Sequence, residues 1–261
     1  MASTSNLSNE ISLAMGEGKR GCTLCALWSR EEEAMVDMIR TDGAPTNSEL
    51  REKIVAATGF CNRHTYVIQR GIQSPKGDES FGGSASAQLV LKKIEDSLTA
   101  LLAEVKGASG KEQIADVISK LERTLYGQAV CPVCEKLLKS DKERISSLLH
   151  MLDSKDFADK YEKSDAICVP HFVSVMKLLP SSGLKSTEAV WGLLMKTELA
   201  RLGAVDTVLN ERMNKYSWDH RSEGVTQEEA GAQNAGKLLI TGVEGLYCRP
   251  RKTSLRPSRE S

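Results

Sequence analysis

The sequence lacks long apolar runs, an excess of either charge, and aromatic residues in any number. No apolar run reaches the ~18 residues that a membrane-spanning helix needs, and the first twenty residues lack the basic and then apolar pattern of a secretory signal. Lys+Arg and Asp+Glu both number 35, so a zero net charge gives no argument for nucleic acid or an anionic membrane as partner. Aromatic residues make up 5%, which also argues against a base-stacking surface. We expect a cytoplasmic protein that binds neither a membrane nor nucleic acid and has a protein as its partner.

Familiar catalytic motifs are missing too. The chain has no glycine-rich phosphate loop, no G-x-S-x-G and no H-E-x-x-H. Its 261 residues, 40% of them hydrophobic and 27% charged, suffice for one large or two small globular domains with a buried core. Any chemistry must therefore be sought in the cysteines and histidines.

Six of the seven cysteines and two of the four histidines form four pairs, each with two residues between its members. In chain order the pairs are Cys22 and Cys25 (CTLC), Cys61 and His64 (CNRH), Cys131 and Cys134 (CPVC), and Cys168 and His171 (CVPH). CxxC and CxxH thus alternate, with 39 residues from Cys22 to Cys61 and 37 from Cys131 to Cys168. Matched order and spacing indicate an internal duplication.

The spacing favours metal ligation. Residues i and i+3 share one face of a helical turn, so a CxxC and a CxxH that each begin a helix can point four ligands at one centre. Three cysteines and one histidine are a standard tetrahedral set for zinc, and a helix N-terminus stabilises thiolate. We therefore predict two zinc sites built from these eight residues. The simplest arrangement joins each CxxC to the next CxxH, and a swapped arrangement between the two copies stays open.

Three other uses of the cysteines compete with structural zinc. An iron–sulfur cluster could take the same ligands in electron transfer, although cluster motifs are usually denser in cysteine. A thiol-dependent enzyme or redox protein could use CPVC, but no βαβ context surrounds it. Disulfides are rare in the cytoplasm. The leading hypothesis is a metal-binding scaffold that binds a protein partner, because a closed Cys₃His site leaves no position for substrate or water.

Helical periodicity without strand alternation predicts an all-α fold with two pseudo-repeated lobes. The expected segments are a flexible tail (1–20), a first helical repeat (21–127), a second helical repeat (128–217), a C-terminal helix (218–245) and a disordered basic tail (246–261). Asn47 or Ser48 is expected to cap a short helix, and Thr226 with Glu229 a capping box. Trp191, Leu194 and Leu199 are placed in core-like positions of a long helix at 185–216. The run Glu31–Glu33 is interpreted as a solvated helix face.

The motifs also carry a resemblance. The stretch CTLCALWSREEE, the motif GFCNRH, the second pairs CPVC and CVPH, and KYSWDHR before a closing helix that ends at Gly242 resemble a prokaryotic family of unknown function. The resemblance spans about residues 20–242. It implies a helical protein with two metal-type motifs and no known reaction.

Overall fold

The protein is described by a computed structural model that places residues 4–16, 21–43, 46–70, 81–106, 111–126, 129–165, 167–215, 222–244 and 246. Helices make up the regular structure of these residues, and none of them lies in a strand, which confirms the all-α prediction. No helix within the described ranges combines the length and hydropathy needed to cross a bilayer.

The chain forms two compact units. Unit 1 comprises residues 1–31 and 139–246, and unit 2 comprises residues 32–138 and 247–261. The boundaries at 31/32 and 138/139 fall inside helices, so each unit combines the CxxC of one predicted repeat with the CxxH of the other. The duplication itself stays a prediction, because the compact units follow other boundaries than the repeats.

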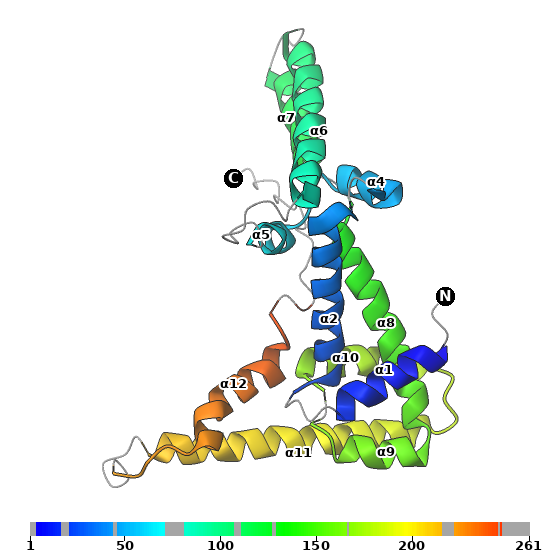
Figure 1. Ribbon diagram of the computed structural model, residues 1–261, viewed down its shortest axis with the longest axis vertical. Helices are drawn as coiled ribbons and strands as arrows, with labels where there is room; N and C mark the ends of the chain where they lie inside the picture. Colours follow the sequence, from blue (N-terminus) through cyan, green and yellow to red (C-terminus); the bar gives the residue numbers. More distant parts are fainter. Residues whose placement is uncertain are drawn as a thin grey trace. The chain divides into compact units, whose positions relative to one another are not determined.

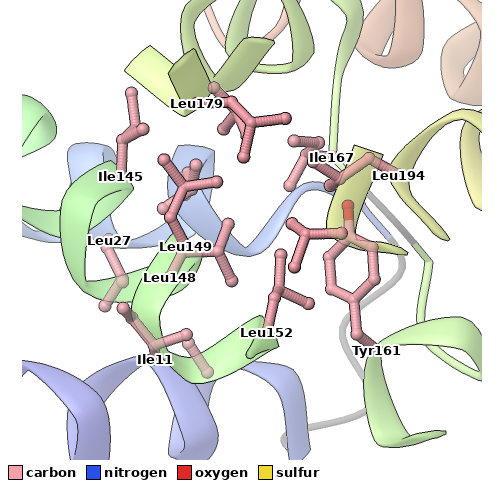
Figure 2. Packing of buried hydrophobic residues seen from close by; sticks show 14 residues of the cluster. Ile11, Leu27, Ile145, Leu148, Leu149, Leu152, Tyr161, Ile167, Leu179 and Leu194 are labelled. Carbon is pink, nitrogen blue, oxygen red and sulfur yellow. The ribbon is translucent and has the colours of Figure 1, made fainter. Parts of the chain in front are cut away.

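Unit 1 is built from all or part of eight helical elements (Figure 1). They are α1 (Thr4–Gly16), the start of α2 (Thr23–Met38), most of α8 (Pro132–Leu152), α9 (Lys155–Glu162), α10 (Val169–Leu178), the 3₁₀ turn η3 (Leu179–Ser181), α11 (Thr187–Asn214) and α12 (Gln227–Thr241). The apolar faces of all of these elements except α12 meet in one core, where Leu148, Leu149 and Leu194 are almost fully buried (Figure 2). Each such side chain contributes roughly 1.5–3 kcal/mol to folding.

The N-terminal segment corrects the expected flexible tail. Residues Thr4–Gly16 form α1, and the side chain of Ile11 is fully buried in the unit 1 core. The polar residues that suggested a tail lie on the other faces of this helix. Leu13 also lies away from the core, and its side chain is 66% exposed. A single apolar stripe on a short polar helix was therefore enough to dock it.

Unit 2 contains the rest of α2, the π-helical turn η1 (Ile39–Gly43), α4 (Ser48–Ala56), α5 (Asn62–Arg70), α6 (Phe81–Lys106), α7 (Lys111–Tyr126) and the start of α8. Helices α6 and α7 lie side by side as a hairpin (Figure 1). Gly82 lets α6 meet η1, because a Cβ atom there would stand 2.0 Å from the carbonyl oxygen of Ile39. The side chain of Arg40 donates to the carbonyls of Val67 and Ile68 at the end of α5.

Local capping signals are confirmed. The side chain of Asn47 accepts a hydrogen bond from the Leu50 amide at 3.0 Å. Thr226 and Glu229 form the expected capping box at the start of α12. Both motifs satisfy amides that have no partner within the first helical turn.

Helix α11 departs from the predicted core pattern. Leu194 is fully buried, as expected, but Trp191 is 50% and Leu199 63% exposed. The buried face instead carries Thr197 and Glu198, which follow Leu194 at the i+3 and i+4 positions of the same face. Apolar residues occur around much of this helix, so the sequence did not single out one face. The predicted basic tail, 246–261, lies outside the described residues apart from Leu246.

Candidate metal centres

The eight predicted ligands gather into two groups, and the grouping is the swapped one. Centre 1 consists of Cys22, Cys25, Cys168 and His171 in unit 1. Centre 2 consists of Cys61, His64, Cys131 and Cys134 in unit 2. The simplest arrangement, in which each CxxC meets the next CxxH, is therefore wrong.

The division of the chain into units accounts for the swap. The boundary between the units falls inside α2, so Cys22 and Cys25 at its start belong to unit 1, whereas Cys61 and His64, which follow η1 and α4, belong to unit 2. The CxxH that completes centre 1 comes instead from α10, almost 150 residues later in the chain.

All four motifs start a helix, as predicted. The carbonyl of each first cysteine accepts the first helical hydrogen bond from the amide four residues on, at 2.8–3.1 Å. Pro132 occupies the first position of α8, where a missing N–H costs nothing. The i+3 ligand then lies in the first turn on the same face, and the free amides and dipole of the turn stabilise thiolate.

The spacing of the donor atoms fits one tetrahedral ion. The Nδ1 atom of His171 lies 3.1–3.4 Å from the three sulfurs of centre 1, and that of His64 lies 3.2–3.5 Å from those of centre 2. Sulfur–sulfur distances are 3.5 Å for Cys25–Cys168 and 3.7 Å for Cys61–Cys134. Bond lengths of about 2.3 Å to sulfur and 2.0–2.1 Å to nitrogen give edges of about 3.8 Å and 3.6 Å in a zinc tetrahedron. A disulfide would need about 2.05 Å, and the six cysteines are free.

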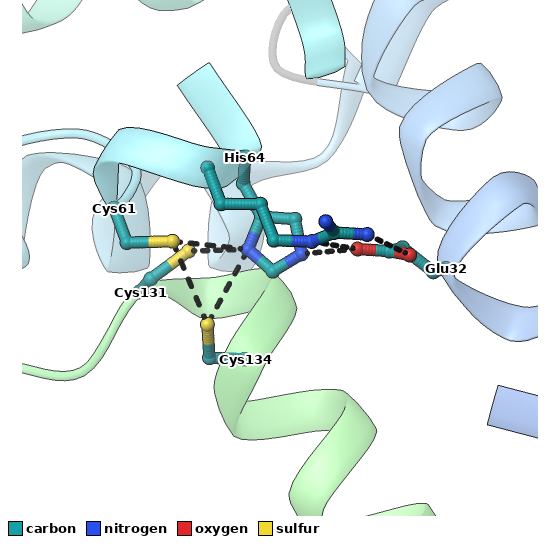
Figure 3. A network of polar contacts seen from close by, with 6 residues as sticks. Glu32, Cys61, His64, Cys131 and Cys134 are labelled. Atoms are coloured by element: carbon teal, nitrogen blue, oxygen red, sulfur yellow. Dashed lines mark hydrogen bonds and ion pairs between the residues drawn. The ribbon is translucent and has the colours of Figure 1, made fainter. Parts of the chain in front are cut away.

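Each histidine is held from behind by a carboxylate. In centre 2, Nε2 of His64 lies 2.9 Å from Oε1 of Glu32, and Arg63 donates two further bonds of 2.9 Å to the same carboxylate (Figure 3). In centre 1, Nε2 of His171 lies 3.0 Å from Oδ1 of Asp141. A carboxylate in this place keeps the proton on Nε2, which leaves Nδ1 with a lone pair for a metal ion.

Both rings sit in a negative field. Burial opposes a positive charge on each imidazole, yet contacts with the thiols and the carboxylate raise the pKa of His64 to about 11 and that of His171 to about 12. Hydrogen bonds from the two other cysteines of its group lower the pKa of Cys61 far below that of a free thiol. The same surroundings that favour an imidazolium also favour a cation at the point where the three sulfurs converge.

The sequence interpretation missed the carboxylates. Glu32 is 8% exposed and Asp141 2% exposed, so the run Glu31–Glu33 is not a uniformly solvated face. Glu31 also has specific partners, because it accepts from Ser140 at 2.7 Å and pairs with Arg144 at 2.8 Å. The repeat held a signal: Glu32 follows Cys22 by ten residues, and Asp141 follows Cys131 by ten.

Comparisons with known proteins place the chain in a family whose function is unknown. A search of curated proteins and a search of solved structures found no significant match. A family profile described as "Family of unknown function (DUF6062)" matches residues 10–230, which include all eight clustered cysteines and histidines. The chain belongs to this family.

Proposed function

We propose that the protein is a helical scaffold stapled by two structural zinc ions, one in each centre. The observation that carries the proposal is the convergence of three sulfurs and one imidazole nitrogen at tetrahedral spacing in two separate places. Cys22, Cys25, Cys168 and His171 would hold one ion, and Cys61, His64, Cys131 and Cys134 the other. A bound zinc ion would supply cross-linking of helix starts and no catalysis, because four protein ligands complete its coordination.

Ligand spacing argues for a single ion in each centre over an iron–sulfur cluster. All four donor atoms of each group lie within 4.8 Å of one another. A four-iron cluster binds each of its ligands through a different iron, so its four ligand atoms must stand farther apart than the edges of one tetrahedron. Mixed sulfur and nitrogen donors in a tetrahedron favour zinc.

The metals would supply much of the folding free energy. Structural zinc contributes roughly 10–16 kcal/mol in small zinc domains at neutral pH, which equals the whole stability of a typical domain. Centre 1 joins α2 to α10, and centre 2 joins α5 to α8. Each ion would therefore tie together segments that are distant in the chain.

The test is elemental analysis with a visible spectrum on protein purified without oxygen. We expect close to two zinc ions per chain and a colourless solution. If the protein contained iron and sulfide and were brown, the scaffold proposal would be wrong, and the same ligands would serve electron transfer. Absence of metal, with thiols that oxidise in pairs, would point to thiol chemistry instead. Cys61→Ser should lower the zinc content to one ion and loosen unit 2, whereas Cys248→Ser, the matched change at the cysteine outside the four sequence motifs, should not.

The α6–α7 hairpin supports a partner-binding role for the scaffold. Five large apolar side chains on it are 43–66% exposed: Leu91, Leu98, Leu102, Ile114 and Ile118. Leu98 and Leu102 share a face of α6, and Ile114 and Ile118 share a face of α7, because each pair is four residues apart. The two helices together carry six basic and six acidic residues, so no net charge opposes the approach of an identical hairpin. We therefore take a second copy of this chain as the partner, with two hairpins forming a four-helix bundle.

Light scattering after size-exclusion chromatography tests this part alone. We expect a dimer, and a monomer for the double variant Leu98→Glu/Ile118→Glu with its zinc content unchanged. A monomeric unmodified protein would overturn the self-association and leave the metal scaffold standing.

A further inference from the structure

Unit 1 contains a cavity of about 440 Å³ between α11 and α12. Its walls are mostly apolar and come largely from the two helices, with Val205 and Val208 on one side and Ala235, Leu238 and Leu239 on the other. The volume lies in the range of small-molecule sites, roughly 300–1,000 Å³. The cavity is large enough for a compact organic ligand.

Two ligands of centre 1 line this cavity. They are Cys22 and Cys168, and Cys22 is the least buried of the four ligands, since the other three are 4% exposed or less. The segment that carries Cys22 is held in place, because Asp165 accepts a bond of 2.9 Å from the amide of Gly21 and pairs with Arg201 of α11 at 3.0 Å. The position of Cys22 at the wall of the cavity is therefore fixed by contacts within unit 1.

Other sides of centre 1 are covered. The turn after α12 packs on the sulfurs, because a Cβ atom on Gly242 would stand 3.2 Å from Sγ of Cys168 and 3.4 Å from Sγ of Cys25. The ring of His171 is fully buried against Asp141. No ligand of centre 2 lines the α11–α12 cavity. Cys61 is the partly exposed ligand of centre 2, as Cys22 is of centre 1, so the difference between the centres is that this cavity leads to centre 1 alone.

We propose that centre 1 is an exchangeable metal centre, served through the α11–α12 cavity by a small soft-donor ligand such as a thiol or a heteroaromatic amine. An uncharged ligand suits the site better than an anion, because the walls are mostly apolar, Arg201 is already paired with Asp165, and Glu228 adds a negative charge to the lining. The sulfur of Cys22 would leave the ion as the donor atom of the entering molecule binds to it, and the freed thiolate would then take a proton from water. No electron is transferred. This inference rests on the proposed function. It adds that the metal ion of centre 1 can be exchanged by a small molecule, whereas that of centre 2 stays structural.

The experiment follows metal release from the purified two-zinc protein with 1,10-phenanthroline as the entering ligand. We expect two phases of one ion each, with the first at least about tenfold faster. N-ethylmaleimide added at the end of the fast phase should label Cys22, Cys25 and Cys168, and peptide mass mapping reads which thiols have reacted. Cys61, Cys131 and Cys134 should be labelled only in the slow phase.

Filling the cavity supplies the matched comparison. Ala235→Trp should slow the fast phase toward the slow one, and Gln233→Trp, on the same helix but away from the cavity lining, should leave both phases unchanged. Ala204→Leu, a milder filling change from the α11 side, serves where the larger side chain prevents folding. Three outcomes would overturn the exchange route: a single phase of metal release, labelling of centre 2 before centre 1, or a fast phase whose rate is unchanged by filling the cavity. If the protein still bound two zinc ions, the proposed scaffold would stand. Protein that binds no zinc would overturn both.

Discussion

Asp141 lies 3.0 Å from the Nε2 atom of His171, and it does so from a helix that begins at ligands of the other centre. Glu32 has the same relationship to His64, on a helix that begins at Cys22. Each CxxC helix therefore carries two functions ten residues apart: the ligands of one centre and the carboxylate behind the histidine of the other. The buried, paired carboxylates are as much part of the centres as the ligands.

Asp141→Asn should weaken zinc binding at centre 1 by about 10–100-fold, because an amide no longer raises the basicity of the imidazole or fixes its tautomer. Competition with a chromophoric chelator measures the affinity of each centre. Glu143→Gln, an exposed change two residues along the same helix, is the control and should change neither affinity. Equal zinc affinity in the Asp141 variant and the unmodified protein would remove the supporting role.

Cys22→Ser tests which motifs share an ion. The swapped grouping predicts that Cys25 and Cys168 become reactive toward a maleimide, because they lose their common ion, while Cys61 stays protected. Mass mapping of the labelled peptides gives the answer directly. Reactivity of Cys61 in place of Cys168 would restore the arrangement in which each CxxC meets the next CxxH.

Gly242→Ala should loosen α12. The backbone has φ of 71° and ψ of −165° at this position, and an added Cβ would stand 2.3 Å from Cδ2 of Leu246, besides crowding two sulfurs of centre 1. We expect the free energy of unfolding of unit 1 to fall by roughly 1–3 kcal/mol, and the amides of α12 to exchange faster with deuterium. Gly203→Ala, in α11 with open space around it, should be neutral or slightly stabilising. Unchanged exchange in α12 would show that the turn tolerates a side chain.

Glu198→Gln should stabilise the protein at alkaline pH. The side chain is 4% exposed, and neither of its carboxylate oxygens has a hydrogen-bond partner among the described residues. Burial, followed by the negative charge of Cys22, raises the pKa of Glu198 from 4.5 to about 7. Between pH 4.5 and 7 the folded state binds more protons than the unfolded state, so this residue lowers stability as the pH rises through that window.

The penalty is complete above pH 7, where the variant should gain roughly 1–3 kcal/mol in urea unfolding. The gain should shrink toward pH 5.5. Glu188→Gln, exposed on the same helix, controls for the loss of one charge. A gain that does not depend on pH would mean that the pKa of Glu198 is the same in the folded and unfolded states, and would contradict the raised pKa.

The sequence by itself determined the donor set, the helix starts and the all-α class, because these depend on neighbours three or four residues apart. A cysteine and its i+3 partner share a face in any helix, and Asn47 or Thr226 caps the helix that follows it wherever that helix lies. Only the tertiary structure decided which CxxC meets which CxxH, since those motifs lie dozens to over a hundred residues apart. It also decided that Glu32 is a buried partner of His64 while Glu33 is exposed. Glu32 and Glu33 have identical side chains that differ only in the direction in which they leave the helix. Which of them is buried therefore depends on where another helix packs.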